Sequence, residues 1–198
     1  MAGQKLTLQQ KLLQKLSPQQ IQMIKLLELP AMQLEQRIKK ELEEEGFTGF
    51  NSISDLIADS SVIPNARGVY LVLYLKNEPV KFITPGSGGH FKGKDPNVPI
   101  KYLHEKWVDN ALVVYIGKAG KDGSISTLRS RIRQYLKFGQ GKNTGHWGGR
   151  FIWQIKDHND LVICWKVLEN EDPRVYEYTL IQQFIYRYNM KPFANLID

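Results

Sequence analysis

Glu177 is the residue of this sequence whose position most directly suggests chemistry. It lies one turn before Leu180 and Ile181 in a segment with helical periodicity, so it shares the inward face of that helix. A buried carboxylate needs a cation or a hydrogen-bond partner. A salt bridge to a nearby arginine would satisfy it. A single carboxylate, together with waters and a substrate phosphate, would also suit Mg²⁺, so both interpretations stay open.

Basic residues gather in a second candidate region. The net charge is +7, and between Lys118 and Arg150 there are eight basic residues against one acid, Asp122. Such a concentration favours a polyanionic partner, and DNA is the partner we expect. The candidate DNA-binding residues are Lys121, Arg129, Arg133, Lys137, Lys142, His146 and Arg150.

Arg131 and Tyr135 are spaced four residues apart, at the edge of the apolar stripe of a predicted helix over residues 126–138. Arginines on a helix usually form a solvated face. Together with the neighbouring Gly117-Lys118 turn, they could instead grip a phosphate in a bidentate manner.

Tyr70 and Tyr115 lie in two β-rich runs, where each alone is typical of a core tyrosine. The four histidines show no metal-ligand spacing, although His146, between Gly145 and Trp147, could contact a phosphate. The sequence has no Walker loop, dinucleotide glycine pattern or Cys/His zinc set.

The elements that must position these residues fall into two modules, 1–46 and 47–198. The first has no aromatic residue and predicts short amphipathic helices, of which the second begins at Ser17-Pro18 and the third at Pro30. Such a short helical module buries little surface alone.

The second module predicts an α/β fold, a small β-sheet flanked by helices. We expect a short helix within 47–61, a loop over 84–99, and a final helix that begins at Asp172-Pro173. The turn is expected over 117–123. The expected strands cover residues 68–74, 111–116, 151–155 and 161–167.

Five elements in this order resemble the GIY-YIG nuclease superfamily, with a UvrC-like motif pattern over residues about 65–198. They are Gly68-Val69-Tyr70, Tyr115-Ile116-Gly117-Lys118-Ala119, the helix from Leu128 to Tyr135, Glu177-Tyr178-Thr179-Leu180-Ile181, and Pro192-Phe193-Ala194-Asn195.

The resemblance implies a metal-dependent endonuclease that hydrolyses DNA phosphodiesters. Glu177 would hold one Mg²⁺ or Mn²⁺, and Arg131 would stabilise the charge on the phosphate. Tyr70 or Tyr115 would activate or position the attacking water. A phenol is a poor base at neutral pH unless its pKa is lowered, so positioning is equally consistent.

The same resemblance assigns supporting roles. Lys118 and Tyr135 would assist the nucleophile and phosphate, and Asn195 would brace the first tyrosine. Compact members of the superfamily separate the two tyrosines by a short hairpin, whereas here an insertion of about residues 76–109 intervenes. That insertion could contact DNA or be a structural excursion. A domain that binds nucleic acid without cutting it remains an alternative.

Residues about 5–45 resemble the start of RpoN-type (sigma-N) transcription factors, the activator-contacting region. The residues that carry the likeness are Gln10-Lys11-Leu12-Leu13-Gln14-Lys15-Leu16-Ser17-Pro18-Gln19-Gln20, Ile24-Lys25-Leu26-Leu27-Glu28-Leu29 and Leu34-Glu35-Gln36. The resemblance implies an enhancer-binding ATPase, or RNA polymerase, as a partner, and offers a transcription-related alternative function.

The cellular compartment is predicted from two features. The lone cysteine, Cys164, lies in an apolar run and cannot form an internal disulfide, so we expect a buried thiol in a reducing, cytoplasmic setting. No apolar run approaches the roughly 20 residues needed to span a bilayer, so no membrane association is expected.

Overall fold

The computed structural model describes residues 31–120 and 125–196. The chain divides into two compact units, Met1–Glu41 and Leu42–Asp198. In the first, the described helix is α3 (Ala31–Glu44), which crosses the boundary in sequence and agrees with the helix expected after Pro30. The helices expected before it lie outside the described residues.

A four-stranded antiparallel sheet forms the centre of the second unit. Its strands are β1 (Thr48–Ser52), β2 (Gly68–Leu73), β3 (Val113–Ala119) and β4 (Val162–Val167), in the spatial order β1-β4-β2-β3. Every residue of β2 is buried, because β2 lies between β4 and β3 and is covered on both faces. β3 lies at an edge of the sheet.

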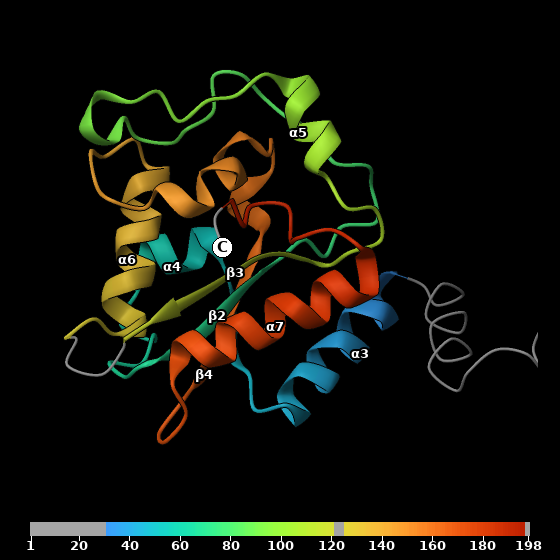
Figure 1. Ribbon diagram of the computed structural model, residues 1–198, viewed down its shortest axis with the longest axis vertical. Helices are drawn as coiled ribbons and strands as arrows, with labels where there is room; N and C mark the ends of the chain where they lie inside the picture. The colour runs from blue at the N-terminus through green and yellow to red at the C-terminus, as the bar shows by residue number, and fades with distance from the viewer. Residues whose placement is uncertain (1–30, 121–124, 197–198) are drawn as a thin grey trace, which may run out of the picture. The chain divides into compact units, whose positions relative to one another are not determined.

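Helices cover both faces of the sheet, as Figure 1 shows. One face packs against α4 (Ile53–Ala58), α6 (Leu128–Gly139) and the 3-10 helix η2 (Trp147–Gln154). The other face packs against α7 (Pro173–Tyr188) through Tyr176, Leu180 and Ile181. The predicted α/β fold, a small β-sheet flanked by helices, is therefore confirmed.

Side-chain caps fix where the two long helices of this unit begin. Thr127 and Ser130 form a reciprocal capping box at the start of α6. Asp172 caps α7 and Pro173 occupies its first turn, so the predicted Asp-Pro start is confirmed.

One predicted strand is wrong. Residues 151–155 form no strand, because Phe151 to Gln154 belong to η2. All five side chains are buried, and a short, mostly apolar run cannot distinguish a strand from a helix. The short helix expected within 47–61 is confirmed as α4, although β1, which was not predicted, precedes it in the same range.

The expected boundaries of β3 also shift. The strand continues through Gly117 and Lys118 to Ala119, where a turn was predicted from residue 117 onward. Pairing with β2 explains the extension, because Gly68 and Val69 lie opposite Ala119 and Lys118.

The insertion is an integral part of the fold. It contains the 3-10 helix η1 (Phe91–Gly93) and the helix α5 (Ile100–Lys106), which the sequence did not predict. Its backbone joins η2, because the Ser87 amide donates to the Trp153 carbonyl. The buried Gln154 amide holds the insertion further: its oxygen accepts from the Val98 backbone, and its nitrogen donates to the Ile83 and Val98 carbonyls.

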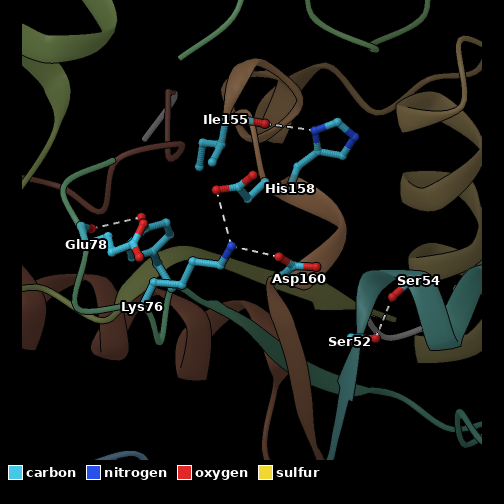
Figure 2. A network of polar contacts seen from close by, with 9 residues as sticks. Ser52, Ser54, Lys76, Glu78, Ile155, His158 and Asp160 are labelled. Atoms are coloured by element: carbon cyan, nitrogen blue, oxygen red, sulfur yellow. Dashed lines mark hydrogen bonds and ion pairs between the residues drawn. The ribbon is translucent and has the colours of Figure 1, made fainter. Parts of the chain in front are cut away.

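An ion cluster ties the start of the insertion to the 3-10 helix η3 (His158–Asp160). The Lys76 ammonium lies 3.2 Å from an oxygen of Asp157 and 2.7 Å from one of Asp160. Figure 2 shows Lys76 pointing toward Asp160. Nearby, the Tyr74 hydroxyl donates to the Glu78 carbonyl. The charges of Lys76, Asp157 and Asp160 satisfy one another, so this cluster stabilises the fold.

Cys164 is a buried free thiol in β4, as expected. None of the helices in the described part of the chain has the length and apolar character needed to cross a membrane.

Candidate active site

Tyr70 and Gly117 face each other across β2 and β3. Both lie on the sheet face that packs against α6, because directly opposed residues share a face. A Cβ atom at position 117 would approach the Tyr70 ring carbon Cζ to 2.4 Å, which no side chain could occupy. Glycine at 117 therefore makes room for the Tyr70 ring to lie over β3.

Three further rings surround Tyr70. Tyr115 lies in an edge-to-face arrangement with it, with ring centroids 6.0 Å apart. Tyr135 from α6 stacks on Tyr115 at 5.8 Å, and the His146 ring lies 4.4 Å from that of Tyr135. We call Tyr70, Tyr115, Tyr135 and His146 the tyrosine cluster. The strands β2 and β3, the helix α6 and the residue before η2 thus bring together side chains that are up to 76 positions apart in the sequence.

His146 has no exposed surface, and its Nε2 shares a hydrogen bond of 3.0 Å with the Tyr70 hydroxyl. Burial, assisted by the charge of Arg131, lowers its pKa to about 3, so the imidazole is neutral at physiological pH. Its Nδ1 has no hydrogen-bond partner among the described residues. The expected phosphate contact of His146 is not available to a side chain in this position.

The tyrosine hydroxyls are neutral as well. Burial raises the pKa of Tyr115 to about 12, with opposing contributions from Arg131, which lowers it, and Glu177, which raises it. Burial also raises the pKa of Tyr70 and of Tyr135 well above the ordinary value. Protonated phenols donate hydrogen bonds and do not accept protons, so this arrangement suits positioning of a water or phosphate better than general-base catalysis.

Arg131 extends from α6 toward this cluster. Its charge lowers the pKa of Tyr70, Tyr115 and His146, so the guanidinium lies within electrostatic reach of all three. One of its nitrogens, Nη1, donates to the Gln134 amide oxygen at 2.9 Å. A half-buried guanidinium beside neutral hydroxyls can bind an anion.

Glu177 of α7 forms an ion pair with Lys118 of β3. A salt bridge was one of the two expected interpretations, but its partner is Lys118 and not the expected arginine. Lys118 points to the α7 face because strand side chains alternate, whereas Tyr115 points to the α6 face. The Glu177 charge nevertheless raises the pKa of Tyr115, which is possible because β3 is an edge strand around which the two faces meet.

Asn195 completes the edge of β3. Its side-chain oxygen accepts from the Ile116 amide at 2.9 Å, and its nitrogen donates to the Ile116 carbonyl at 2.8 Å. The expected bracing of the first tyrosine is therefore corrected: Asn195 braces the strand residue that follows Tyr115. The side chain takes the place of a further strand on this edge.

The basic residues predicted to bind DNA differ in their contacts and exposure. Arg129 donates to the Ile63 and Ser61 carbonyls, so its guanidinium secures the preceding loop. Arg150 is half-buried, and Lys121 lies outside the described residues. The exposed candidates are Arg133, Lys137 and Lys142.

The donor set for a metal is sparse. Within residues 31–120 and 125–196 there is no cluster of three or more His, Cys, Asp or Glu side chains that could hold an ion. Glu177 is mostly buried, with 16% of its side chain exposed, and stands at the tyrosine cluster with Lys118 on one oxygen. One carboxylate fits Mg²⁺ when waters and a substrate phosphate supply the other ligands.

One glycine beside the tyrosine cluster was missed in the sequence. A Cβ at Gly149 would lie only 3.0 Å from the Tyr135 ring, whereas one at Gly148 would lie at an ordinary 3.7 Å from the Tyr115 hydroxyl. Glycine at 149 therefore lets the backbone of η2 approach Tyr135 closely. The Gly-Gly pair next to His146 was the available signal.

Comparison with known proteins separates the two parts of the chain. The family described as sigma-54 factor, activator interacting domain, matches residues 5–44. That match supports the resemblance of the N-terminal segment to RpoN-type factors, and it covers 40 of the 198 residues. No curated protein and no solved structure matches the chain, so the resemblance of residues 65–198 to GIY-YIG nucleases has no support from this source.

Proposed function

We propose that residues 47–198 form a GIY-YIG-type endonuclease that hydrolyses DNA phosphodiesters with the help of Mg²⁺ or Mn²⁺. The observation that carries the proposal is that the charges of Arg131 and Glu177 both reach Tyr115, whose ring lies beside that of Tyr70, while Lys118 pairs with Glu177. Phosphodiester hydrolysis needs an oriented water and positive charge on the phosphate, and this set offers both.

Each side chain has a role that follows from its position. Arg131 binds a non-bridging phosphate oxygen and stabilises the charge that develops there. The neutral hydroxyl of Tyr115 donates a hydrogen bond that orients the attacking water or the phosphate, and the fully buried Tyr70 ring positions Tyr115 from beside it. His146 holds the Tyr70 hydroxyl at 3.0 Å and thereby limits its rotation.

Glu177 supplies a negative charge to the site, and Lys118 supplies a positive one. Lys118 neutralises the largely buried Glu177 carboxylate in the absence of substrate. A divalent ion on Glu177 would polarise the phosphoryl oxygen and lower the pKa of a bound water. The ammonium of Lys118 would then be released toward the phosphate.

Plasmid cleavage tests this function. The wild-type protein is expected to convert supercoiled DNA to nicked or linear product with Mg²⁺ or Mn²⁺ and to lose this activity in EDTA. Arg131→Ala should slow turnover about 100-fold or more, because one transition-state charge partner is removed. Arg174→Ala, which removes an exposed arginine of α7 that is not among the DNA-binding candidates, should change turnover only slightly.

The result that overturns the proposal is equally specific. Metal-independent cleavage, or equal turnover by Arg131→Ala and the wild type, would exclude the assigned site. Salt-sensitive DNA binding without cleavage on supercoiled, nicked, branched and single-stranded DNA would favour the alternative, a domain that binds nucleic acid without cutting it.

A second function is proposed for the N-terminal segment. The match of residues 5–44 to the activator interacting domain favours binding to an enhancer-binding ATPase of the sigma-54 system, in a transcription-related role. RNA polymerase is a further candidate partner. α3, which lies within the match from Ala31, supplies a helix with an Arg37–Glu41 ion pair on its exposed surface.

Affinity measurement with a purified sigma-54 activator ATPase, held in its nucleotide-bound state, tests the second function. The full chain should bind, and a chain that lacks residues 5–44 should not. Equal binding by the two chains, or no binding by the full chain, would contradict this role. DNA cleavage by the shortened chain would be unaffected in either case.

A further inference from the structure

Arg150 differs from Arg129 and Arg131 in having no hydrogen-bond or ion-pair partner among the described residues. Its guanidinium carbon lies 4.6 Å from the Trp147 ring centroid and 4.8 Å from that of Phe151. Burial lowers the pKa of this guanidinium, opposed by Tyr102. Nε is inaccessible to solvent and, among the described residues, has no hydrogen-bond partner.

The contrast with neighbouring arginines is direct. Arg129 donates to two backbone carbonyls, and Arg131 donates to Gln134. In the described part of the chain, no carboxylate forms an ion pair with Arg150. A half-buried cation that lacks a counter-ion gains most from an anion that arrives with a ligand.

The position of Arg150 indicates which anion. It follows Gly148 and Gly149, whose backbone lies against the Tyr115 hydroxyl and the Tyr135 ring. A DNA strand carries a phosphate on each side of the one being cleaved. Because the backbone of η2 lies against Tyr115 and Tyr135, a strand whose scissile phosphate meets Tyr115 and Arg131 brings an adjoining phosphate to the side of the site on which η2 lies.

We propose that Arg150 binds a backbone phosphate of the DNA strand next to the phosphate being cleaved. This inference rests on the proposed nuclease function and adds a second phosphate subsite to it. The rings of Trp147 and Phe151 both contact the guanidinium, which restricts its orientation before DNA arrives.

The insertion contributes to this subsite by bracing it. Tyr102 of α5 packs edge-to-face on Phe151, with ring centroids 5.8 Å apart. Phe91 of η1 lies so close to Gly145 that a Cβ there would be 3.2 Å from its ring. The insertion therefore supports the segment that carries Trp147 and Arg150 from two sides.

A purely structural role for Arg150 makes different predictions. If the cation–π contacts were its whole purpose, its removal would lower thermal stability and leave the salt dependence of DNA binding unchanged. A phosphate contact instead lowers the slope of log K against log salt by about 0.9, the release of one counterion.

The experiment measures equilibrium binding of a fluorescent DNA duplex and single strand, in EDTA, between about 50 and 200 mM salt. Arg150→Gln should reduce the slope by about 0.9 and weaken binding about tenfold. Arg150→Lys, which keeps the charge, should keep most of the slope. Arg187→Gln is the matched control, because Arg187 also lies over an aromatic ring, Tyr188, but is exposed on α7.

Any of three results would overturn the proposed subsite. The first is an unchanged salt slope in Arg150→Gln, and the second is an equal loss of slope in Arg187→Gln. The third is the absence of DNA binding by the wild type. Thermal unfolding of each variant separates loss of fold from loss of contact. Binding is read in EDTA, so a failure of cleavage would overturn the nuclease proposal alone. A slope effect that persists without cleavage would leave Arg150 as a phosphate-binding residue.

Discussion

Two polar clusters of this protein differ in how far their groups satisfy one another. Around Lys76, a lysine and two aspartates satisfy one another at the surface, with 35% of the Lys76 side chain and 60% of the Asp160 side chain exposed (Figure 2). Around Tyr115, tyrosines, a histidine and an arginine are buried or half-buried, and polar atoms of His146 and Arg150 lack partners among the described residues.

The difference lies in what burial does to the two sets. The Lys76 ion pairs keep its charge favourable, and its pKa is raised by hydrogen bonds to the aspartates. In the tyrosine cluster, burial itself is the first cause of each pKa change. A cluster that stabilises a fold compensates its charges internally, whereas a site retains uncompensated groups for a ligand.

The largest effect on folding is expected from Gly117→Ala. The added methyl group would overlap the Tyr70 ring, whose nearest atom would be 2.4 Å away, and should destabilise the protein by about 1–3 kcal/mol. Gly148→Ala is the control, because its methyl would meet the Tyr115 hydroxyl at an ordinary 3.7 Å. Denaturant unfolding of both variants checks this prediction. Equal stabilities would mean that the ring does not lie over position 117.

Asn195→Ala should lower the free energy of unfolding by a similar or slightly smaller amount than Gly117→Ala. It removes both hydrogen bonds to the Ile116 backbone and leaves this edge of β3 without its amide partner. The expected loss is about 1–3 kcal/mol, less if water reaches the edge. Asn189→Ala is unsuitable as a control because Asn189 has a positive φ, so Asn143→Ala on an exposed loop serves instead. Losses of equal size in the two variants would remove the special role of Asn195.

His146 should make stability depend on pH. Its pKa is about 3 in the folded protein and ordinarily 6.5, so below pH 6.5 the unfolded chain binds a proton that the folded chain does not. The free energy of unfolding should therefore fall from pH 6.5 to about 5, by at most about 1.4 kcal/mol per pH unit. The groups that face it are the Arg131 guanidinium and the hydroxyls of Tyr70, Tyr115 and Tyr135, whose raised pKa values keep them neutral in this window.

His146→Gln isolates that contribution. Its unfolding free energy should change less steeply over the same pH range than that of the wild type, whatever its absolute stability. Parallel pH profiles for the two proteins would show that His146 is accessible to protons in the folded state.

The smallest effect belongs to the Lys76 cluster. Lys76→Met should cost about 0–1 kcal/mol, because exposed ion pairs contribute little. DNA cleavage should be unchanged. Thermal unfolding and the plasmid assay check both parts, and a loss of cleavage comparable to that of Arg131→Ala would erase the distinction between the two clusters.

Local patterns in the sequence predicted most of the scaffold. The Asp172-Pro173 start of α7 and the β-rich runs of β2 and β4 depend on neighbouring residues, so they were predictable. The 3-10 conformation of residues 151–154 was not, because it depends on burial against the sheet and on the Gln154 contacts with the insertion.

The candidate site residues could be named from the sequence, but their geometry could not. Helical spacing singled out Glu177, and the family resemblance singled out Tyr70 and Tyr115. It could not show that Glu177 pairs with Lys118 around the edge of β3, or that His146 lies inside the protein. Those facts depend on contacts between residues 59 and 76 positions apart, which no local pattern records.

The most direct test of the central claim compares Glu177→Gln with Asp160→Asn in the Mg²⁺-dependent plasmid assay. Both substitutions remove one carboxylate charge from an ion pair with a lysine. The nuclease site predicts that Glu177→Gln loses at least about 100-fold in cleavage rate, whereas Asp160→Asn cleaves like the wild type. Equal rates in the two variants would contradict the assignment of Glu177 and, with it, the site built around Tyr115.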